Sequence, residues 1–331
     1  MWGFQVIDEP QIKMFPAVAK LVAQAKLAGD MAFVNLFPDY AFGPHSPFGP
    51  SYSAYVKQFV RDVKPNMLSL DNYPHFDTAG GSGCVSPPCP AGPQTKANYI
   101  ANLLVIREAA LEAGIPFMNF VKSMPYGSQA SGSPSPYDVS ESEMRWQVMT
   151  SLALGAKGVM YFCYWTPSGA YFSLGQAIMT PAPGSKPNLA NQVPGPKYPM
   201  VRRINSKLRT LGEWLLERTS SGLIQASGGR ANTTTIEGCA GIASINGTNV
   251  GDAWSFLLGL FDTNRTVLLV NQDANHPALA TLALRGDGEM HEVDPDSGDL
   301  KLALDDAPFA PGFQLSVNAG DARLFTWETQ V

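Results

Sequence analysis

Two adjacent carboxylates, Asp8 and Glu9, follow a short apolar segment near the start of the sequence. Residues 4–7 are typical of a buried strand, and Pro10 ends that strand and suits the first residue of a following helix. Paired carboxyl groups at such a junction can donate a proton and stabilise positive charge, as cleavage of a glycosidic bond requires. The alternative is that both residues only cap the next helix, whose N-terminus favours negative charge.

Three mechanisms are compatible with these residues. Glu9 is the candidate acid, and apolar neighbours or a nearby negative charge would have to raise its pKa. Asp71 follows a third apolar segment and is the candidate base or nucleophile, unless it only anchors the turn before Pro74. In the second mechanism, Asp8 orients an acetamido group of the substrate, and that group attacks internally. In the third case, the site binds sugar without cleaving it. Successive strand residues face opposite sides, so Asp8 and Glu9 share a site only if the strand ends there.

Aromatic and polar side chains near the ends of the expected strands form the candidate sugar-binding set. Aromatic rings can stack on the apolar faces of pyranose rings, although packing in the core is the simpler role for any single ring. Trp165 is the strongest candidate, because it ends an apolar strand and is followed by Thr-Pro. Amide and imidazole groups at these positions can bind hydroxyl groups. The set comprises Trp165, Tyr73, Tyr126, Asn35, Asn119 and His75.

Strand-like and helix-like segments alternate over the first two thirds of the chain. We expect strands at residues 4–7, 33–37, 67–73, 117–121 and 159–165, and helices at 11–28, 51–63, 95–113, 140–155 and 199–217. The strands are almost continuously apolar, which indicates a parallel sheet covered on both faces. The strand-to-helix connections are long and the helix-to-strand connections are short. The site is therefore expected where the strands end.

The pattern changes near residue 219. Helical periodicity stops, and short strand candidates separated by Asn, Asp and Gly turns follow at residues 254–261, 266–271, 280–285, 288–294, 312–317 and 322–326. Such spacing is typical of an antiparallel β-sandwich. We therefore expect an α/β domain with the catalytic residues over residues 1–219, and a β-sandwich domain over residues 220–331.

Composition and charge exclude several classes of function. The 331 residues are 15% charged with a net charge of −5, so no nucleic-acid partner is expected. No apolar run approaches the ~20 residues that cross a bilayer, so no membrane partner is expected either. The spacing of cysteine and histidine indicates no metal site, and no motif indicates a cofactor. The sequence leaves the oligomeric state open.

Cysteines and glycosylation sequons favour an extracellular or secretory location. Cys84 and Cys89 share a loop rich in proline and glycine and can close a small disulfide. Sequons begin at Asn232, Asn246 and Asn264. No signal peptide is visible in a sequence that starts inside a strand.

Four segments near the expected strand ends share a pattern with a known family. They are Val6-Ile-Asp-Glu-Pro10, Val34-Asn-Leu-Phe-Pro38, Leu68-Ser-Leu-Asp-Asn-Tyr-Pro74 and Leu154-Gly-Ala-Lys-Gly-Val-Met-Tyr-Phe-Cys-Tyr-Trp165. Together they resemble the later part of a glycoside hydrolase barrel, nearest to the β-galactosidase-like branch of clan A. The resemblance covers about residues 2–217 and implies an oligo- or polysaccharide substrate. It places Asp8 and Glu9 at the end of strand four, residues 117–121 in strand seven and residues 159–165 in strand eight.

Two features depart from that family. Strands one to three have no counterpart, so we expect a TIM-barrel-like domain that lacks its first strands, within a longer protein, because open sheet edges invite aggregation. The family's nucleophilic glutamate at the end of strand seven is also missing, since residues 119–123 read Asn-Phe-Val-Lys-Ser. The first prediction is a glycoside hydrolase acting on O-glycosidic bonds with Glu9 as general acid, either active or an inactive fragment. The alternative is a non-catalytic carbohydrate-binding protein with a degenerate barrel.

Overall fold

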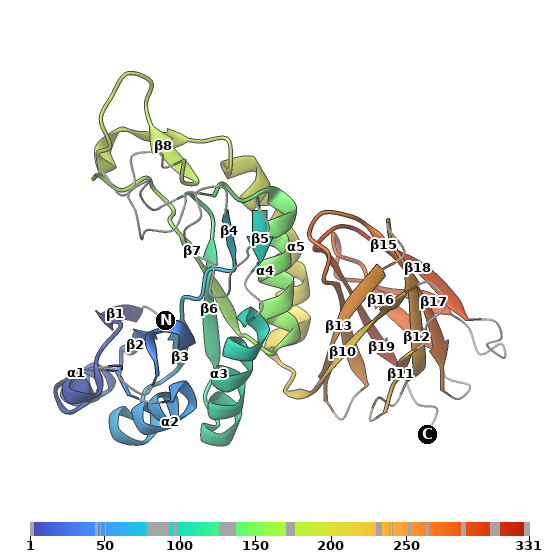
Figure 1. Ribbon diagram of the computed structural model, residues 1–331, viewed down its shortest axis with the longest axis horizontal. Helices are drawn as coiled ribbons and strands as arrows, with labels where there is room; N and C mark the ends of the chain where they lie inside the picture. The colour runs from blue at the N-terminus through green and yellow to red at the C-terminus, as the bar shows by residue number, and fades with distance from the viewer. Residues whose placement is uncertain are drawn as a thin grey trace. The chain divides into compact units, whose positions relative to one another are not determined.

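The chain folds into two compact units, each of which is described by itself. The computed structural model describes residues 3–43, 46, 48–49, 51–77, 93–95, 98–125, 137–169, 176–229, 234–237, 239, 241–250, 253–262, 265–285, 289–304 and 312–327. The first unit comprises residues 1–137, 156–164 and 168–175, and the second comprises residues 138–155, 165–167 and 176–331. Figure 1 labels helices and strands of both units.

The first unit is built on a five-stranded parallel sheet, as the sequence predicts. Its order is β1-β2-β3-β6-β7, with all neighbouring pairs parallel. The strands are β1 (Gly3–Asp8), β2 (Met31–Leu36), β3 (Leu68–Leu70), β6 (Phe117–Lys122) and β7 (Gly158–Phe162). Within the described ranges the sheet does not close, so β1 and β7 form its edges. The expected mixed α/β class is confirmed at this level.

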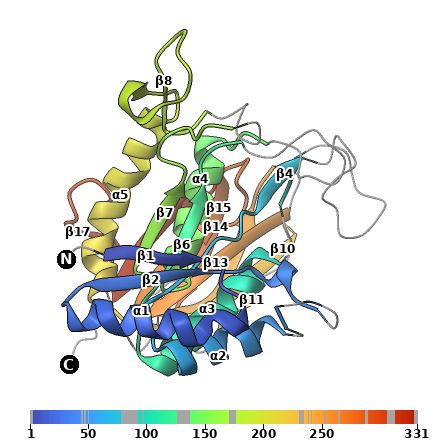
Figure 2. The same cartoon turned by 90° about the vertical axis from the view of Figure 1, so that its left-hand side faces the viewer.

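Three helices of the first unit form one layer, in which α1 and α3 contact the sheet and α2 packs against α1 and α3 (Figure 2). They are α1 (Phe15–Leu27), α2 (Tyr52–Val63) and α3 (Tyr99–Ala113). Helix α2 starts where the Ser51 hydroxyl accepts from the Ala54 N–H at 3.4 Å, and it ends where Lys64 adopts a left-handed backbone. Its buried residues recur at three- and four-residue spacing, which turns one stripe of the helix toward the core. These residues are Tyr52, Tyr55, Val56, Phe59 and Val63.

Two expectations about the first strand are wrong. Residues 4–7 do form a strand, but it is not buried, since the side chain of Phe4 is 48% exposed. The reason is that β1 is an edge strand and pairs only with β2 in the described part of the sheet. Pro10 also does not begin the helix, because a 3-10 turn at Ile12–Met14 comes first and α1 starts only at Phe15.

The long connections after the strands contain two small hairpins that the sequence pattern does not indicate. In the first unit, β4 (His75–Asp77) pairs antiparallel with β5 (Pro93–Thr95). In the second unit, β8 (Met179–Pro181) pairs antiparallel with β9 (Gln192–Pro194). Strands this short leave no period-2 signature in the sequence. Cys84, Cys89 and Tyr126 lie outside the described residues.

The second unit carries two antiparallel sheets, a six-stranded one of order β10-β13-β14-β19-β16-β17 and a four-stranded one of order β11-β12-β15-β18. One hydrophobic core joins them, with Phe256 and Phe325 from the first sheet and Leu282 and Val317 from the second. The strands are β10 (Ser220–Gly229), β11 (Thr234–Thr235), β12 (Ile242–Thr248), β13 (Ala253–Phe261), β14 (Thr266–Asn271), β15 (Ala278–Leu284), β16 (Met290–Val293), β17 (Leu300–Leu304), β18 (Phe313–Val317) and β19 (Ala322–Trp327).

Two helices, α4 (Glu141–Ala153) and α5 (Tyr198–Leu216), belong to this second unit. Helix α4 begins with a capping box, because the Ser140 N–H donates to Glu143 Oε2 at 2.7 Å and the Ser140 hydroxyl accepts from the Glu143 N–H at 3.2 Å. Helix α4 lies so close to β13 that a Cβ at Gly259 would overlap the carbonyl oxygen of Ala153. The domain boundary near residue 219 stays a prediction, since α4 and α5 group with the β sheets.

Candidate active site

Strand β1 ends at Asp8, and the chain turns sharply at Glu9. Glu9 has a left-handed backbone with φ of 46°, which L-residues adopt rarely. Its N–H donates to the carbonyl oxygen of Asn35 in β2 at 2.9 Å. The turn ends the alternation of the strand, so Asp8 and Glu9 need not face opposite sides of the sheet. The two carboxylates can share one site only if the strand ends at this point, and β1 does end at Asp8.

A chain of hydrogen bonds links three strands at the level of Asp8. The Asn35 side chain donates from Nδ2 to Asp8 Oδ1 at 3.1 Å, and its Oδ1 accepts from the hydroxyl of Ser69 in β3 at 3.1 Å. Strand pairing places these residues side by side, because Asp8 is in register with Asn35 and Asn35 with Ser69. Gln5 also donates to Asp8 Oδ1 at 3.1 Å. Asp8 is exposed, whereas Asn35 and Ser69 are buried.

Glu9 and Asp71 are electrostatically coupled acids. Burial, and then repulsion from Asp8, raise the pKa of the half-buried Glu9 to about 7. Burial raises the pKa of Asp71 to about 8, with further contributions from the negative charges of Glu9 and Asp8, while a hydrogen bond from Asn35 acts in the opposite direction. Asp71 Oδ1 has no hydrogen-bond partner in the described part of the chain. The three carboxyl groups predicted to be catalytic therefore interact with one another.

Two tyrosines at the start of α2 adjoin this group. The Tyr55 hydroxyl donates to the carbonyl oxygen of Pro10 at 2.8 Å, which holds the residue that follows the Glu9 turn. Burial raises the pKa of Tyr55, and the charge of Glu9 adds to the effect. Burial likewise raises the pKa of Tyr52, with a further contribution from the charge of Asp71. Neither tyrosine is predicted from the sequence, because both read as apolar-face residues of a helix.

The other predicted ligands in the first unit differ in how far they are buried. Asn119 is fully buried in β6, where its Nδ2 donates to the Tyr99 hydroxyl at 2.8 Å. His75 is only 3% exposed in β4. Tyr73 is partly exposed, and its ring centroid lies 5.4 Å from that of Phe162. Their sugar contacts stay predictions.

Trp165 belongs to the second unit. Strand β7 ends at Phe162, so Trp165 follows the strand rather than ending it, and it forms an isolated bridge with Met179. Its side chain is 47% exposed, as a stacking platform requires. Its convergence with Glu9 stays a prediction, as does the role of Tyr126, which lies outside the described residues.

Lys122 is a buried lysine at a strand end that the sequence pattern does not single out. It ends β6, is 3% exposed, and donates from Nζ to the carbonyl oxygen of His75 at 2.9 Å. Its Nζ also lies 5.7 Å from the centroid of the Tyr137 ring. A lysine directly after the apolar segment of residues 117–121 is the signal that would have found it. The end of β6 therefore carries a cation rather than a carboxylate.

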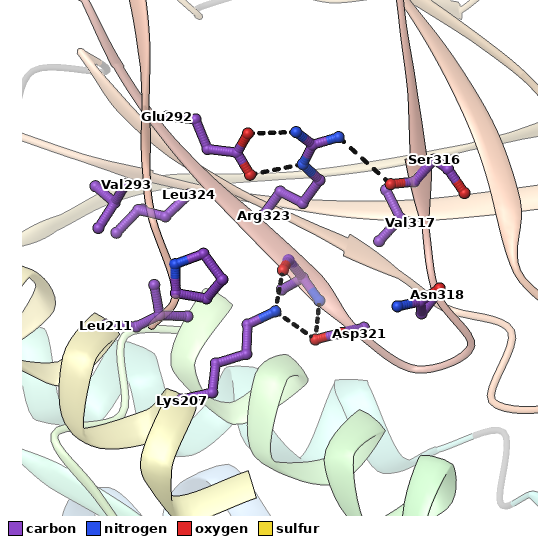
Figure 3. Close-up of a pocket in the computed structure, with 12 residues that line it drawn as sticks. Lys207, Leu211, Glu292, Val293, Ser316, Val317, Asn318, Asp321, Arg323 and Leu324 are labelled. Atoms are coloured by element: carbon purple, nitrogen blue, oxygen red, sulfur yellow. Dashed lines mark hydrogen bonds and ion pairs between the residues drawn. The ribbon is translucent and has the colours of Figure 1, made fainter. Parts of the chain in front are cut away.

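A separate hollow of about 230 Å³ lies in the second unit, between α5 and the strands β16, β18 and β19 (Figure 3). Arg323 donates to both carboxylate oxygens of Glu292, and Lys207 donates to Asp321 Oδ1 and to the carbonyl oxygen of Ala322, both at 2.7 Å. The ion pair of Lys207 with Asp321 links α5 to the residue that precedes β19. Across the described ranges, no group of three His, Cys, Asp or Glu side chains is arranged to hold a metal ion.

Comparison with known proteins gives matches to solved structures. No family model and no curated protein sequence matches this chain. The matching structures include a beta-galactosidase from the psychrophilic Marinomonas ef1, with 13% identity over 62% of this chain and 30% of that chain and a TM-score of 0.39. They also include a beta-galactosidase from Bacillus circulans sp. alkalophilus, with 10% identity over 90% of this chain and 63% of that chain and a TM-score of 0.43.

An alpha-fucosidase from Thermotoga maritima also matches, with 8% identity over 93% of this chain and 67% of that chain and a TM-score of 0.32. The chain spans less than two thirds of the length of either beta-galactosidase. Because these TM-scores are below 0.5, the activity of this chain has to be argued from its own residues. No helix in the described ranges has the length and apolar character needed to cross a membrane.

Proposed function

We propose that this chain acts on O-glycosidic bonds, with Glu9 as the general acid. The observation that carries the proposal is the position and charge state of Glu9. Its carboxyl group follows the last residue of a parallel strand, where α/β folds bind ligands, and its pKa of about 7 keeps much of it protonated at neutral pH. A carboxyl group that retains its proton near pH 7 can donate it to a leaving oxygen.

Asp71 is the second carboxyl group of the proposed mechanism and acts at the anomeric carbon. Glu9 and Asp71 titrate as a pair with apparent pKa values of about 7 and 8, so at neutral pH they hold more than one proton between them. The reactive form is the one in which the pair holds a single proton, on Glu9, so that Glu9 donates it to the leaving oxygen while the already ionised Asp71 acts as base or nucleophile. Asp8 raises the pKa of Glu9 in this scheme. Where the substrate carries an acetamido group, Asp8 can instead orient that group for internal attack.

Carbohydrate binding without cleavage is the second candidate. Lys122, buried at the end of β6, favours it, because that strand end offers a cation rather than a carboxylate. A lysine there can bind a hydroxyl group but cannot replace the carboxylate nucleophile of a retaining glycosidase. In this case, Asp8 and Glu9 would contact sugar hydroxyls only. Secretion is proposed alongside both candidates, on the sequons and on Cys84 and Cys89.

The test is hydrolysis of a panel of aryl glycosides by the chain, expressed with any coding sequence that adjoins it in its own transcript. Glu9→Gln keeps shape and hydrogen bonding but removes the acid proton, so the rate should fall by about 10²–10⁴-fold. Glu213→Gln, at an exposed glutamate of α5, is the matched control and should leave the rate unchanged. Comparing N-acetylated with plain sugars separates the two roles of Asp8, since Asp8→Asn should impair mainly the former if it orients the acetamido group.

Sugar binding without turnover would support the second candidate. Turnover that Glu9→Gln does not reduce would overturn the assignment of the acid. Loss of turnover in Glu213→Gln as well would mean that the effect is not specific to the site.

A further inference from the structure

Asn35 contacts two of the three carboxylate residues of the candidate site and acts electrostatically on the third. Its carbonyl oxygen accepts from the Glu9 N–H at 2.9 Å, and its Nδ2 donates to Asp8 Oδ1 at 3.1 Å. The same side-chain amide favours the ionised form of Asp71 and so lowers the pKa of that carboxyl against the effect of burial. One residue of β2 therefore joins the ends of both flanking strands.

The orientation of the Asn35 amide is set from one side. Ser69 donates its hydroxyl to Asn35 Oδ1 at 3.1 Å, so the amide oxygen faces β3 and the nitrogen is left for the carboxylates. Both residues are inaccessible, with Asn35 2% exposed and Ser69 fully buried. A buried amide whose oxygen and nitrogen are both engaged is poorly placed to bind a sugar hydroxyl.

We infer that Asn35, oriented by Ser69, is a positioning residue that holds Asp8 and the turn at Glu9 against β3, the strand that Asp71 follows, and that it is not a substrate ligand. The catalytic consequence of this inference rests on the proposed function. Its structural content does not depend on that function, because the hydrogen bonds exist without substrate. The N–H donor stabilises ionised carboxyl groups, and the backbone carbonyl holds the turn at Glu9.

The consequence is a defined distribution of protons. Asp71 faces the charges of Glu9 and Asp8 from the end of β1 and lies near the phenol of Tyr52 from α2. Burial and these negative charges hold its proton, whereas the Asn35 amide favours the ionised form. Removing the amide takes away one of the two contributions that favour the ionised form, the other being a backbone hydrogen bond, so Asp71 should ionise at a higher pH. A role limited to packing would leave that titration where it is.

The experiment follows the carboxyl carbons of the full chain by NMR during a pH titration. Asn35→Leu keeps the approximate shape but has no amide, and the Asp71 midpoint should rise by about one pH unit. Ser69→Ala is the milder variant, which releases the amide without deleting it, and it should shift the midpoint in the same direction by less. Ser123→Ala is the matched control, because Ser123 is an equally buried serine that donates to the Cys163 carbonyl oxygen at 3.3 Å instead. It should leave the Asp71 midpoint unchanged.

The inference is overturned if Asn35→Leu folds and the titration midpoint of Asp71 does not change. It is also overturned if Ser123→Ala shifts that midpoint as much as Ser69→Ala does. If Asn35→Leu does not fold, the comparison of Ser69→Ala with Ser123→Ala decides alone. Where the protein hydrolyses an aryl glycoside, its pH–rate profile should move with the titration, while KM changes by less than about twofold. An absence of hydrolysis would contradict the proposed function and would leave the titration result standing.

Discussion

The N–H of Glu9 donates to the carbonyl oxygen of Asn35 at 2.9 Å from a left-handed backbone with φ of 46°. This bond helps to turn the chain at the end of β1, and the turn sets where the Glu9 side chain begins. A residue other than glycine in that conformation is strained by about 1–2 kcal/mol. The surrounding contacts therefore hold Glu9 in place against a local loss of stability.

That strain predicts an unusual order of stability at position 9. Glu9→Gly should be more stable to urea than Glu9→Ala by about 1 kcal/mol, because glycine adopts positive φ freely. Within a helix the order is reversed, so Ala23→Gly at an exposed position of α1 is the control and should lose about 1 kcal/mol. Equal stability of the two variants at position 9 would mean that the turn relaxes in solution.

Burial of Asp71 predicts a pH-dependent stability. Its pKa is about 8 in the folded chain and about 3.9 when unfolded, so between these values the folded state binds more protons. Stability should therefore fall as pH rises from about 4 to 8, and Asp71→Asn should remove the larger part of that fall, leaving the part due to Glu9. Relative to wild type, the variant should gain roughly 2–4 kcal/mol between pH 4 and pH 8, measured by urea unfolding. A difference that is the same at both pH values would argue against a shifted carboxyl group.

The sequence predicts the features of this site that depend on local patterns, and it misses those that depend on pairing between distant segments. Apolar runs and helix caps predict the five parallel strands and the positions of Asp8, Glu9 and Asp71 at or just beyond their ends, since these features are local. The burial of β1 is mispredicted, because burial depends on whether another strand pairs with it. The hydrogen-bond partners of Asn35 cannot be predicted from the sequence either, because the register between strands sets them.

The β sheets show the same limit in another form. Strand β14 is a continuous apolar run and is predicted correctly, whereas β10 and β12 are missed. Residues 220–229 read Ser-Ser-Gly-Leu-Ile-Gln-Ala-Ser-Gly-Gly, and β12 contains Asn246-Gly247, a pair typical of turns. Pairing with β13 and β15 overrides these weak local preferences.

The close approach of α4 to β13 predicts that Gly259 cannot be replaced. Gly259→Ala would put a methyl group against the carbonyl oxygen of Ala153, and it should destabilise the chain by about 1–3 kcal/mol or more. At Gly212 in α5 an added methyl group would meet no atom within 4 Å, so Gly212→Ala should instead stabilise by about 0.5–1 kcal/mol. Urea midpoints of the two variants should therefore move in opposite directions, and a shift in the same direction would contradict the packing.

The most direct test of the central claim is the pH–rate profile of aryl glycoside hydrolysis by the wild-type chain and by Glu9→Gln. A general acid must carry its proton to act, so the wild-type rate should fall as pH rises through the range of about 7 to 8 over which Glu9 and Asp71 lose their protons. In Glu9→Gln the rate should be lower by about 10²–10⁴-fold and should lose this fall, because glutamine has no proton to titrate. A variant with the same rate and the same profile as the wild type would contradict the assignment of Glu9 as the acid.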